Sequence, residues 1–403
     1  MSNIQTRTNL SKYFTVLIIA YPILSLYSVM GSPVSLSNIL LVVALIGLFL
    51  NTTRNSYHNK ASNSFFLPFY VYIIMHLLLI LLIKDNINYV DTIGSTLRFL
   101  LNLTPLVFFV GGYFDYKLGI KVYRTFCLIS VYYALTQFIL HYALGLYLPG
   151  YISTPVFPVI NHQISEFEDN MMKSWFTVFR PRSFFAEPAH FAEYILGYYT
   201  LCLFGECDNP KQRRKDIITV LVGIVISLSS TGILTAFALL LVFFMLKLRK
   251  GFSKQSFAIV ITLIPVALIV LFNTSLPNYF MNRFEISAGY RFRSEETLPN
   301  FTTFSVIFGE SMGYKAGFYM TGFLRLFAYF GILGIILFFI GILKTIKNNK
   351  SITLRSLVVV FLILNIGTEL LFQSILLPYF AIIIALSNKS LDQYKNEEER
   401  STG

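Results

Sequence analysis

Apolar runs of nearly twenty residues recur along the whole chain, separated by short polar segments. A helix needs roughly 20 apolar residues to cross the hydrocarbon core of a bilayer. The pattern therefore predicts an all-α polytopic membrane protein in which residues 1–403 form a single integral membrane domain. We expect about twelve transmembrane helices, at 13–31, 36–50, 65–83, 94–113, 120–145, 184–204, 216–229, 232–247, 256–274, 319–343, 354–372 and 374–388.

Two of the predicted spans are unusually short. The runs at 216–229 and 232–247 are divided by the polar sequence SLSSTG at 227–232. This pattern allows either two short spans or one broken element. The first run, in contrast, is predicted to be a retained span, because no cleavage pattern of small residues follows it.

The positions of lysine and arginine predict the orientation of these spans. Both residues concentrate on the cytoplasmic side of membrane proteins. If the N-terminus is inside, seven segments become cytoplasmic and hold 22 of the 32 lysines and arginines, whereas the short outer turns hold only Lys84. The sequence thus predicts a multi-pass protein of the bacterial cytoplasmic (inner) membrane with both termini cytoplasmic and a tail at 389–403.

Composition excludes several other classes. Only 13% of the residues are charged, about half the usual share for a soluble protein. The net charge of +12 lies largely at the ends of spans, so it indicates a bilayer and no nucleic-acid partner. The three cysteines form no metal-binding or disulfide pattern, and no nucleotide-binding or HExxH motif occurs. We expect neither a metal nor a cofactor.

Two outer loops, at 146–183 and 275–318, are much longer than the others. Loops of this length in compact proteins are usually functional or disordered. Both contain many aromatic residues and neither is low-complexity, which favours ordered loops. They also contain or adjoin most of the basic residues outside the cytoplasmic segments: Lys173, Arg180, Arg182, Arg283, Arg291, Arg293, Lys315 and Arg325.

The end of the first loop has the features of an anion site. Arg180 and Arg182 precede Glu187 and Pro188, which resemble the first turn of a helix. A helix N-terminus attracts anions, and guanidinium groups bind phosphate in bidentate fashion. Arginines of the second loop repeat the pattern. An anion held at membrane level suggests the head group of a phosphorylated lipid.

Titratable side chains follow the two arginines in the sequence. Glu187, His190 and Tyr194 share one face of the expected helix, and a carboxylate in a desolvated pocket is a candidate general base. Simpler roles stay open: Glu187 can cap its helix or pair with a loop arginine, and His190 can serve packing. The two arginines can also simply anchor the chain to lipid phosphates.

Two further ionisable groups lie within predicted spans, Arg98 and Glu369. Such groups are expensive in a bilayer and are candidates for function. A salt bridge from Arg98 to Glu369 or to Glu193 is the alternative.

The segment RPRSFFAEPAHFAEYI at 180–195 resembles a segment typical of bacterial O-antigen polymerases of the Wzy type. The sequence at 289–314 resembles the second large loop of that family, with Arg293 followed by Gly309, and the 323–339 run continues it with an aromatic–Gly–x–x–Gly pattern. SLSSTGILTAF at 227–237 is similar to a short turn between two spans in these enzymes. The resemblance covers about residues 175–340.

This resemblance implies a membrane glycosyltransferase of GT-C-like architecture that needs no metal. Its donor and its acceptor would both be undecaprenyl-diphosphate-linked oligosaccharides, with a chain-length regulator and a flippase as further candidate partners. The implied site residues are Glu187, Arg182, Arg293 and His190 for catalysis, Arg180, Arg182, Arg291, Arg293 and Arg98 for the diphosphate, and Trp175, Tyr290 and Tyr194 for the glycan.

Two alternatives share part of this pattern. An O-antigen ligase has the same layout but usually carries a histidine in the second large loop, and none of the five histidines lies in 275–318. A flippase for the lipid-linked repeat unit also fits twelve spans with both termini inside. A transporter should have two matching halves, however, and we find no such match in the sequence.

Overall fold

The computed structural model describes residues 2–32, 34–54, 65–84, 88–151, 154, 156–159, 179–205, 209–248, 301–313, 320–347, 349 and 351–388. Within these residues the chain is helical and forms no β-strand, which confirms the all-α prediction. The helices are α1 (Ser2–Leu24), α2 (Leu36–Arg54), α3 (Leu67–Ile83), α4 (Tyr89–Thr104), η1 (Pro105–Phe109), α5 (Val110–Tyr113), α6 (Tyr116–Leu144), α8 (Pro188–Phe204), α9 (Pro210–Ile226), α10 (Ser230–Leu248), α13 (Thr303–Phe308), α14 (Gly322–Lys347), α15 (Ile352–Gly367), η5 (Leu370–Phe372) and a final helix, Leu376–Asn388.

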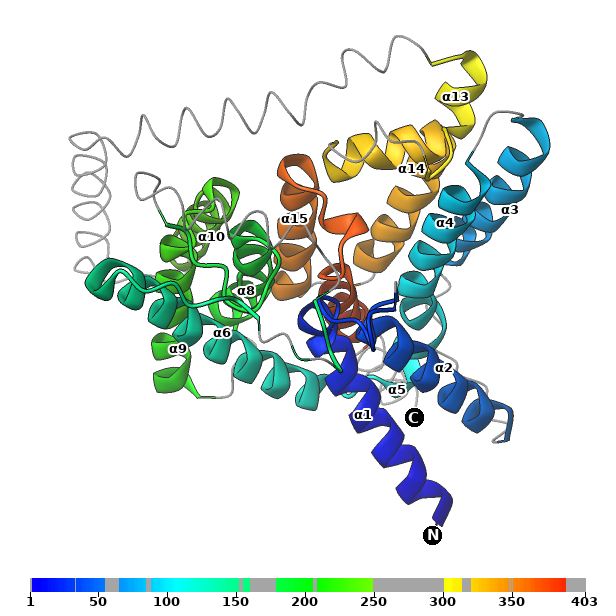
Figure 1. Ribbon diagram of the computed structural model, residues 1–403. Coiled ribbons are helices and arrows are strands. Elements are labelled where there is room, and N and C mark those ends of the chain that lie inside the picture. The colour runs from blue at the N-terminus through cyan, green and yellow to red at the C-terminus, as the bar shows by residue number, and fades with distance from the viewer. Residues whose placement is uncertain are drawn as a thin grey trace.

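The helices form two groups, and α15 and the Leu376–Asn388 helix lie between them (Figure 1). The first group contains α6, α8, α9 and α10, and the second contains α3, α4, α13 and α14. Helix α15 lies between the groups and packs against α8, α10 and α14. Helices α9 and α10 are two separate helices that pack against each other, so the 216–247 region is not one broken element.

Apolar helices support the membrane prediction in part. Three stretches of the described chain are long and apolar enough to cross a bilayer, Tyr89–Tyr113, Tyr116–Leu144 and Gly322–Lys347. Six shorter apolar helices accompany them: Asn9–Leu24, Leu36–Asn51, Leu67–Ile83, Ser230–Leu246, Ile352–Gly367 and Leu376–Asn388. Each predicted span overlaps a described helix, with ends that differ by up to several residues, except 256–274, which lies outside the described residues.

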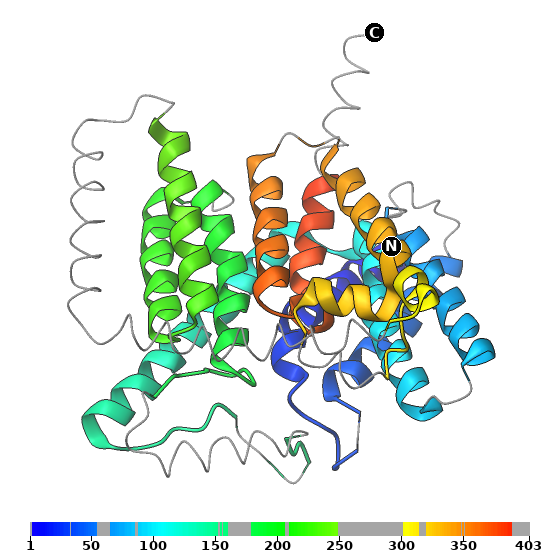
Figure 2. The same ribbon diagram turned by 90° about the horizontal axis from the view of Figure 1, so that it is seen from above.

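Polar contacts between helices divide the bundle into two ends. At one end, here called the loop end, Ser25 contacts Ser374, Arg180 contacts Ser227, His190 contacts Gln373 and Lys84 pairs with Glu310. At the other, the tail end, Ser11 contacts Tyr113, Arg213 contacts Cys202, Thr353 contacts Phe204 and Asn349 contacts Leu386. Successive long helices therefore run in alternate directions between the two ends. In Figure 2, helices α8, α9, α10 and α15 run side by side, and the segments at the start of α8 lie below them.

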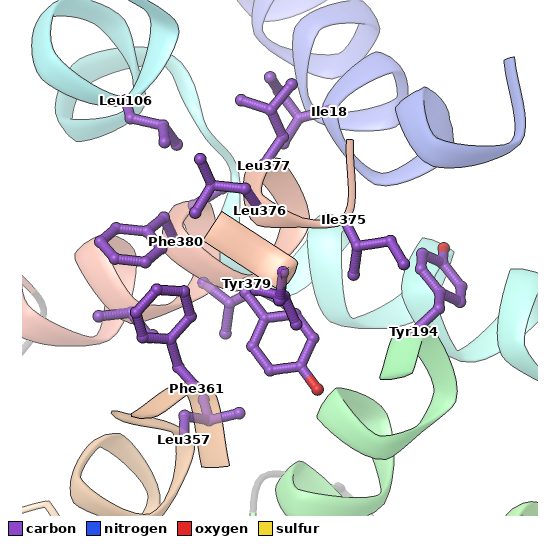
Figure 3. Close-up of a cluster of buried hydrophobic side chains, with 14 of the residues drawn as sticks. Ile18, Leu106, Tyr194, Leu357, Phe361, Ile375, Leu376, Leu377, Tyr379 and Phe380 are labelled. Atoms are coloured by element: carbon purple, nitrogen blue, oxygen red, sulfur yellow. The ribbon is translucent and has the colours of Figure 1, made fainter. Parts of the chain in front are cut away.

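The core surrounds the Leu376–Asn388 helix (Figure 3). Almost every residue of this helix is buried, and Tyr379 and Phe380 are among its largest side chains. The Phe380 ring packs edge-on against Phe361 of α15, 4.7 Å away, and against Phe66, 5.2 Å away. A helix that is apolar on all sides belongs in the interior of a bundle. This helix thus joins the two groups of helices.

Helix α14 is broken at Gly331, where φ is 63° and ψ is −169°. Its first part, 322–330, lies across the bundle (Figure 2), whereas the second part runs along it. The span predicted at 319–343 is therefore made of two helical segments that meet at Gly331. A left-handed φ favours glycine, because a Cβ atom would approach the following carbonyl oxygen.

The break is packed against the end of α13. A Cβ atom on Gly331 would overlap the carbonyl group of Ile307 and would lie 2.7 Å from the Gly309 nitrogen. A Cβ atom on Gly309 would in turn overlap the Tyr329 carbonyl group. The Tyr72 hydroxyl of α3 donates to the Phe330 carbonyl oxygen at 2.8 Å, which provides a partner for a carbonyl left over at a helix end. Two glycines distant in sequence thus allow two backbones to touch.

Candidate functional site

The start of α8 is the centre of the candidate site. Glu187 is the N-cap residue in an extended conformation, and Pro188 takes the first helical position, as the sequence predicts. The Glu187 side chain makes no capping hydrogen bond and is exposed at the loop end. The capping role considered for Glu187 is therefore wrong, and the Glu187 carboxylate is exposed at the surface of the bundle.

Arg182 lies beneath this helix start. Its side chain is only 4% exposed, its Nη1 donates to the Ala186 carbonyl oxygen at 3.1 Å, and its Cζ lies 5.3 Å from the centre of the Tyr151 ring. Burial lowers the pKa of Arg182, but a guanidinium group stays protonated in proteins. Glu187 is close enough to act electrostatically on this charge. In this structure Arg182 therefore supplies a buried positive charge and has little surface for a phosphate.

Gln137 of α6 connects both ends of the first long loop. Its amide nitrogen donates to the Leu148 carbonyl oxygen at 3.0 Å, and its amide oxygen accepts from the Ser183 backbone N–H at 2.9 Å. Ser183 is buried and has a φ of 53°, an uncommon conformation for a residue with a side chain. Its hydroxyl donates to the Ser130 carbonyl oxygen at 2.7 Å. Helix α6 thus fixes the backbone that leads into α8.

Replacing Gln137 with leucine should loosen the base of this loop. The Leu148 carbonyl and the Ser183 N–H would lose their partners, and each unsatisfied buried group costs about 1–3 kcal/mol. We expect faster cleavage within 146–183 by a protease added to the purified protein. Gln212→Leu, at an exposed position of the tail end, is the control and should leave the cleavage rate unchanged. Equal cleavage of both variants would contradict the role of Gln137.

The segment that carries Arg180 is also anchored. The Phe179 ring stacks on His141 of α6 with ring centres 4.2 Å apart, and the backbone N–H of Phe179 donates to the Tyr142 hydroxyl. Arg180 is half-buried, and its Nε lies 3.3 Å from the Ser227 carbonyl oxygen, in the turn between α9 and α10. Two arginines of the predicted anion site are therefore held at the loop end by neighbouring helices.

His190 faces the turn between α15 and the final helix. Its Nε2 lies 2.8 Å from the Gln373 amide nitrogen, and both side chains are half-buried. The structure therefore brings Glu187 and His190 to the same helix start. Gln373, which sequence reasoning did not select, is the residue that holds His190 in place.

The same turn carries Glu369, which pairs with Arg325 of α14. The Arg325 Nη2 and Glu369 Oε2 atoms are 2.6 Å apart, and the side chains are 9% and 34% exposed. The salt bridge from Arg98 to Glu369 considered above is therefore wrong: Arg98 is exposed on α4, near Tyr21. The prediction placed Arg325 beside the second loop but gave it no role in the site.

Two residues of the same helix belong to its packing. Tyr194 is fully buried within the hydrophobic core (Figure 3). Its ring lies 5.0 Å from those of Tyr123 and Phe185, and its hydroxyl donates to the Ile19 carbonyl oxygen. A sugar cannot reach this ring, so its assignment to glycan binding is wrong. Glu193 is buried as well, on the face that meets Tyr379.

Other predicted site residues cannot be placed in this geometry. Arg291, Arg293, Tyr290 and Trp175 lie outside the described residues. Among the residues that are described, no group of three or more His, Cys, Asp or Glu side chains could hold a metal ion. The described site is therefore built from guanidinium groups, two exposed or half-exposed carboxylates, one imidazole and one amide.

These groups lie at one end of the bundle. They come from the start of α8, the first part of α14 and the turn after α15, which are far apart in sequence. The contacts of His190 with Gln373 and of Glu369 with Arg325 join the three segments. No protein-family model matches this chain, and no curated protein matches it significantly.

Proposed function

We propose that this protein is a polysaccharide polymerase. It would join lipid-diphosphate-linked oligosaccharide repeat units at the loop end, with the lipid diphosphate as leaving group. The observation that carries the proposal is the start of α8, where an exposed carboxylate and a half-buried imidazole stand above a buried guanidinium group. The resemblance of 180–195 to Wzy-type polymerases supports the same reaction.

The chemistry requires two kinds of group. The acceptor hydroxyl attacks the anomeric carbon of the donor sugar, the bond from that carbon to the phosphate oxygen breaks, and the diphosphate leaves with the electron pair. Positive charge lowers the energy of this developing anion, and it acts more strongly where water is excluded. Arg180 and Arg182 would supply such charge, together with Arg291 and Arg293 of the second loop. Glu187 or His190 would receive the proton of the acceptor hydroxyl.

We further propose a topology for this function. The helices would cross the bacterial inner membrane twelve times with both termini in the cytoplasm, and the loop end would face outward, in a GT-C-like arrangement. The alternation of helix ends supports this topology, because contacts at each end join segments that the topology places on one side of the membrane. The tail end then carries the exposed Lys211, Arg214 and Lys215, as cytoplasmic segments usually do.

One observation favours a second candidate, a flippase for the lipid-linked repeat unit. Transporters often bind substrates at discontinuous helices near the middle of the membrane. Helix α14 is discontinuous at Gly331 and carries Arg325 on its first part. In a flippase the same arginines would hold the diphosphate without breaking a bond.

Purified protein incubated with a lipid-diphosphate-linked repeat unit distinguishes the two functions. We expect a ladder of multimers on a gel that separates glycans by length, without added nucleotide. Single repeats that cross the bilayer of reconstituted vesicles, with no ladder, would identify a flippase and overturn the polymerase proposal.

The ladder also tests individual residues. Arg182→Lys should lower chain formation, because lysine cannot both stack on Tyr151 and donate in the geometry of a guanidinium group. Lys173→Arg, a charge-preserving change in the same loop, is the control. Glu187→Gln should reduce transfer while lipid-linked substrate still binds. Equal activity of all three variants would remove Arg182 and Glu187 from the reaction.

A further inference from the structure

The orientation of the Gln373 amide determines which nitrogen of a neutral His190 ring carries the proton. A neutral imidazole has one nitrogen that donates and one that accepts. The Gln373 side chain can present either its oxygen or its nitrogen to Nε2, since the two ends of an amide exchange by a half-turn. With the oxygen toward the ring, Nε2 keeps its proton and Nδ1 has a free electron pair. The same oxygen also accepts from Nε2–H of a protonated ring.

The turn that carries Gln373 is held rigidly. Glu369 pairs with Arg325, and the Phe372 ring stacks on Phe99 of α4 with centres 5.0 Å apart. The Leu371 N–H donates to the Asn365 side-chain oxygen at 2.8 Å. A partner that sets the orientation of a catalytic group must itself be fixed by its surroundings. Gln373 meets this condition, because the residues before it are anchored to three helices.

Several charged residues lie on the elements around His190. On its own helix, Glu187 and Glu193 lie three residues before and after it. The preceding segment carries Arg180 and Arg182, and the turn carries Glu369 with its partner from α14. Between α9 and α10, residues 227–231 are Ser, Leu and Thr only, and the end of α1 contributes Ser25. The charged groups on these elements thus include both carboxylates and guanidinium groups, and Gln373, which contacts the ring, is neutral.

We propose that Gln373 is a positioning residue for His190, which accepts the proton of the acceptor sugar. This inference rests on the proposed polymerase function. The hydroxyl proton moves to His190 Nδ1 as the oxygen bonds to the donor carbon, and the bond from that carbon to the lipid diphosphate breaks. Nε2–H donates to the Gln373 oxygen throughout, and the imidazolium ring afterwards releases its proton to water. Glu187 then serves to position the acceptor hydroxyl groups.

Two measurements on Gln373→Glu test this role. A carboxylate at this distance should raise the pKa of His190 in the variant above that in the wild type, because a neighbouring negative charge favours the protonated ring. Hydrogen–deuterium exchange at the imidazole carbon, followed by mass spectrometry of the 180–195 region, reports that pKa without need of activity. Because the neutral ring is the base, the acid limb of the pH–rate profile for chain formation should shift to higher pH by the same amount. Activity at pH 6 should therefore fall severalfold and recover at higher pH.

Two other variants complete the test. Methionine in Gln373→Met cannot form this hydrogen bond, so the variant should lower turnover more than it raises KM. The pH–rate profile of His190→Gln should lack the acid limb, because the titrating base is absent. Gln212→Glu, which adds the same charge at the tail end, should leave the profile unchanged. A profile of Gln373→Glu that superimposes on that of the wild type overturns the inference, as does a shifted pKa with an unshifted profile. If the wild-type protein forms no chains, the proposed polymerase function is overturned instead, and the role of His190 as the base falls with it.

Discussion

Gly331→Ala is expected to destabilise the protein by about 3 kcal/mol or more. A left-handed φ costs a residue with a side chain roughly 1–2 kcal/mol, and forced overlap in a packed interior costs about 1–3 kcal/mol. Both apply here, because φ is 63° and the new methyl group would overlap the Ile307 carbonyl. The overlapping atoms belong to the backbone and cannot move aside as a flexible side chain would.

Thermal unfolding of the detergent-solubilised protein measures this effect. Gly94→Ala is a matched control, because a Cβ atom there has nothing within 4 Å and the residue lies inside α4. Alanine exceeds glycine in helix propensity by roughly 1 kcal/mol, so this variant should be as stable as the wild type or more so. Equal stability of the two variants would show that the close approach at Gly331 is not required.

Breaking the pair of Arg325 and Glu369 is the second change with a large expected effect. Arg325→Leu and Glu369→Leu each remove one member of this ion pair, at a cost of about 3 kcal/mol, near the lower end of the range for buried pairs. The lower end applies because Glu369 keeps about a third of its surface exposed. The double variant should lose less than the sum of the two, because no charge is left alone.

A double-mutant cycle of unfolding free energies measures this coupling. We expect a coupling energy of about 1 kcal/mol or more between the two positions. Arg325→Leu combined with Asp216→Leu, at the opposite end of the bundle, provides the control and should be additive. An additive result for Arg325 and Glu369 would falsify the view that the pair clamps the turn after α15.

Local patterns in the sequence predicted much of the helical framework. The apolar runs indicated the helices, and Glu187 and Pro188 marked the first turn of α8, although the predicted span of 184–204 begins four residues before the helix. The break in α14 was missed because glycine is common in membrane helices and carries no signal of its own there. It follows from contact with Gly309, 22 positions earlier, which is a property of the fold.

The site was predictable to a similar extent. Charge and helix-start signals lie within 180–190, so the sequence predicted that Glu187 and His190 lie together at the start of a helix, as they do. The burial of Tyr194 was not predictable, because α8 is apolar around most of its circumference and no face of it stands out as lipid-facing. Gln373 and Arg325 gain their importance from partners far along the chain, and a single sequence does not reveal such pairs.

The central position of the Leu376–Asn388 helix has a consequence for biosynthesis. The ribosome makes this helix after all the helices that pack around it. Phe66 can contact Phe380 only after about 300 further residues have been added to the chain. At roughly 5–20 residues per second, that interval lasts on the order of 15–60 s. The earlier helices therefore complete their packing only after this helix has been made, and a chain whose translation stops before residue 376 should be cleaved more readily by proteases than the full chain.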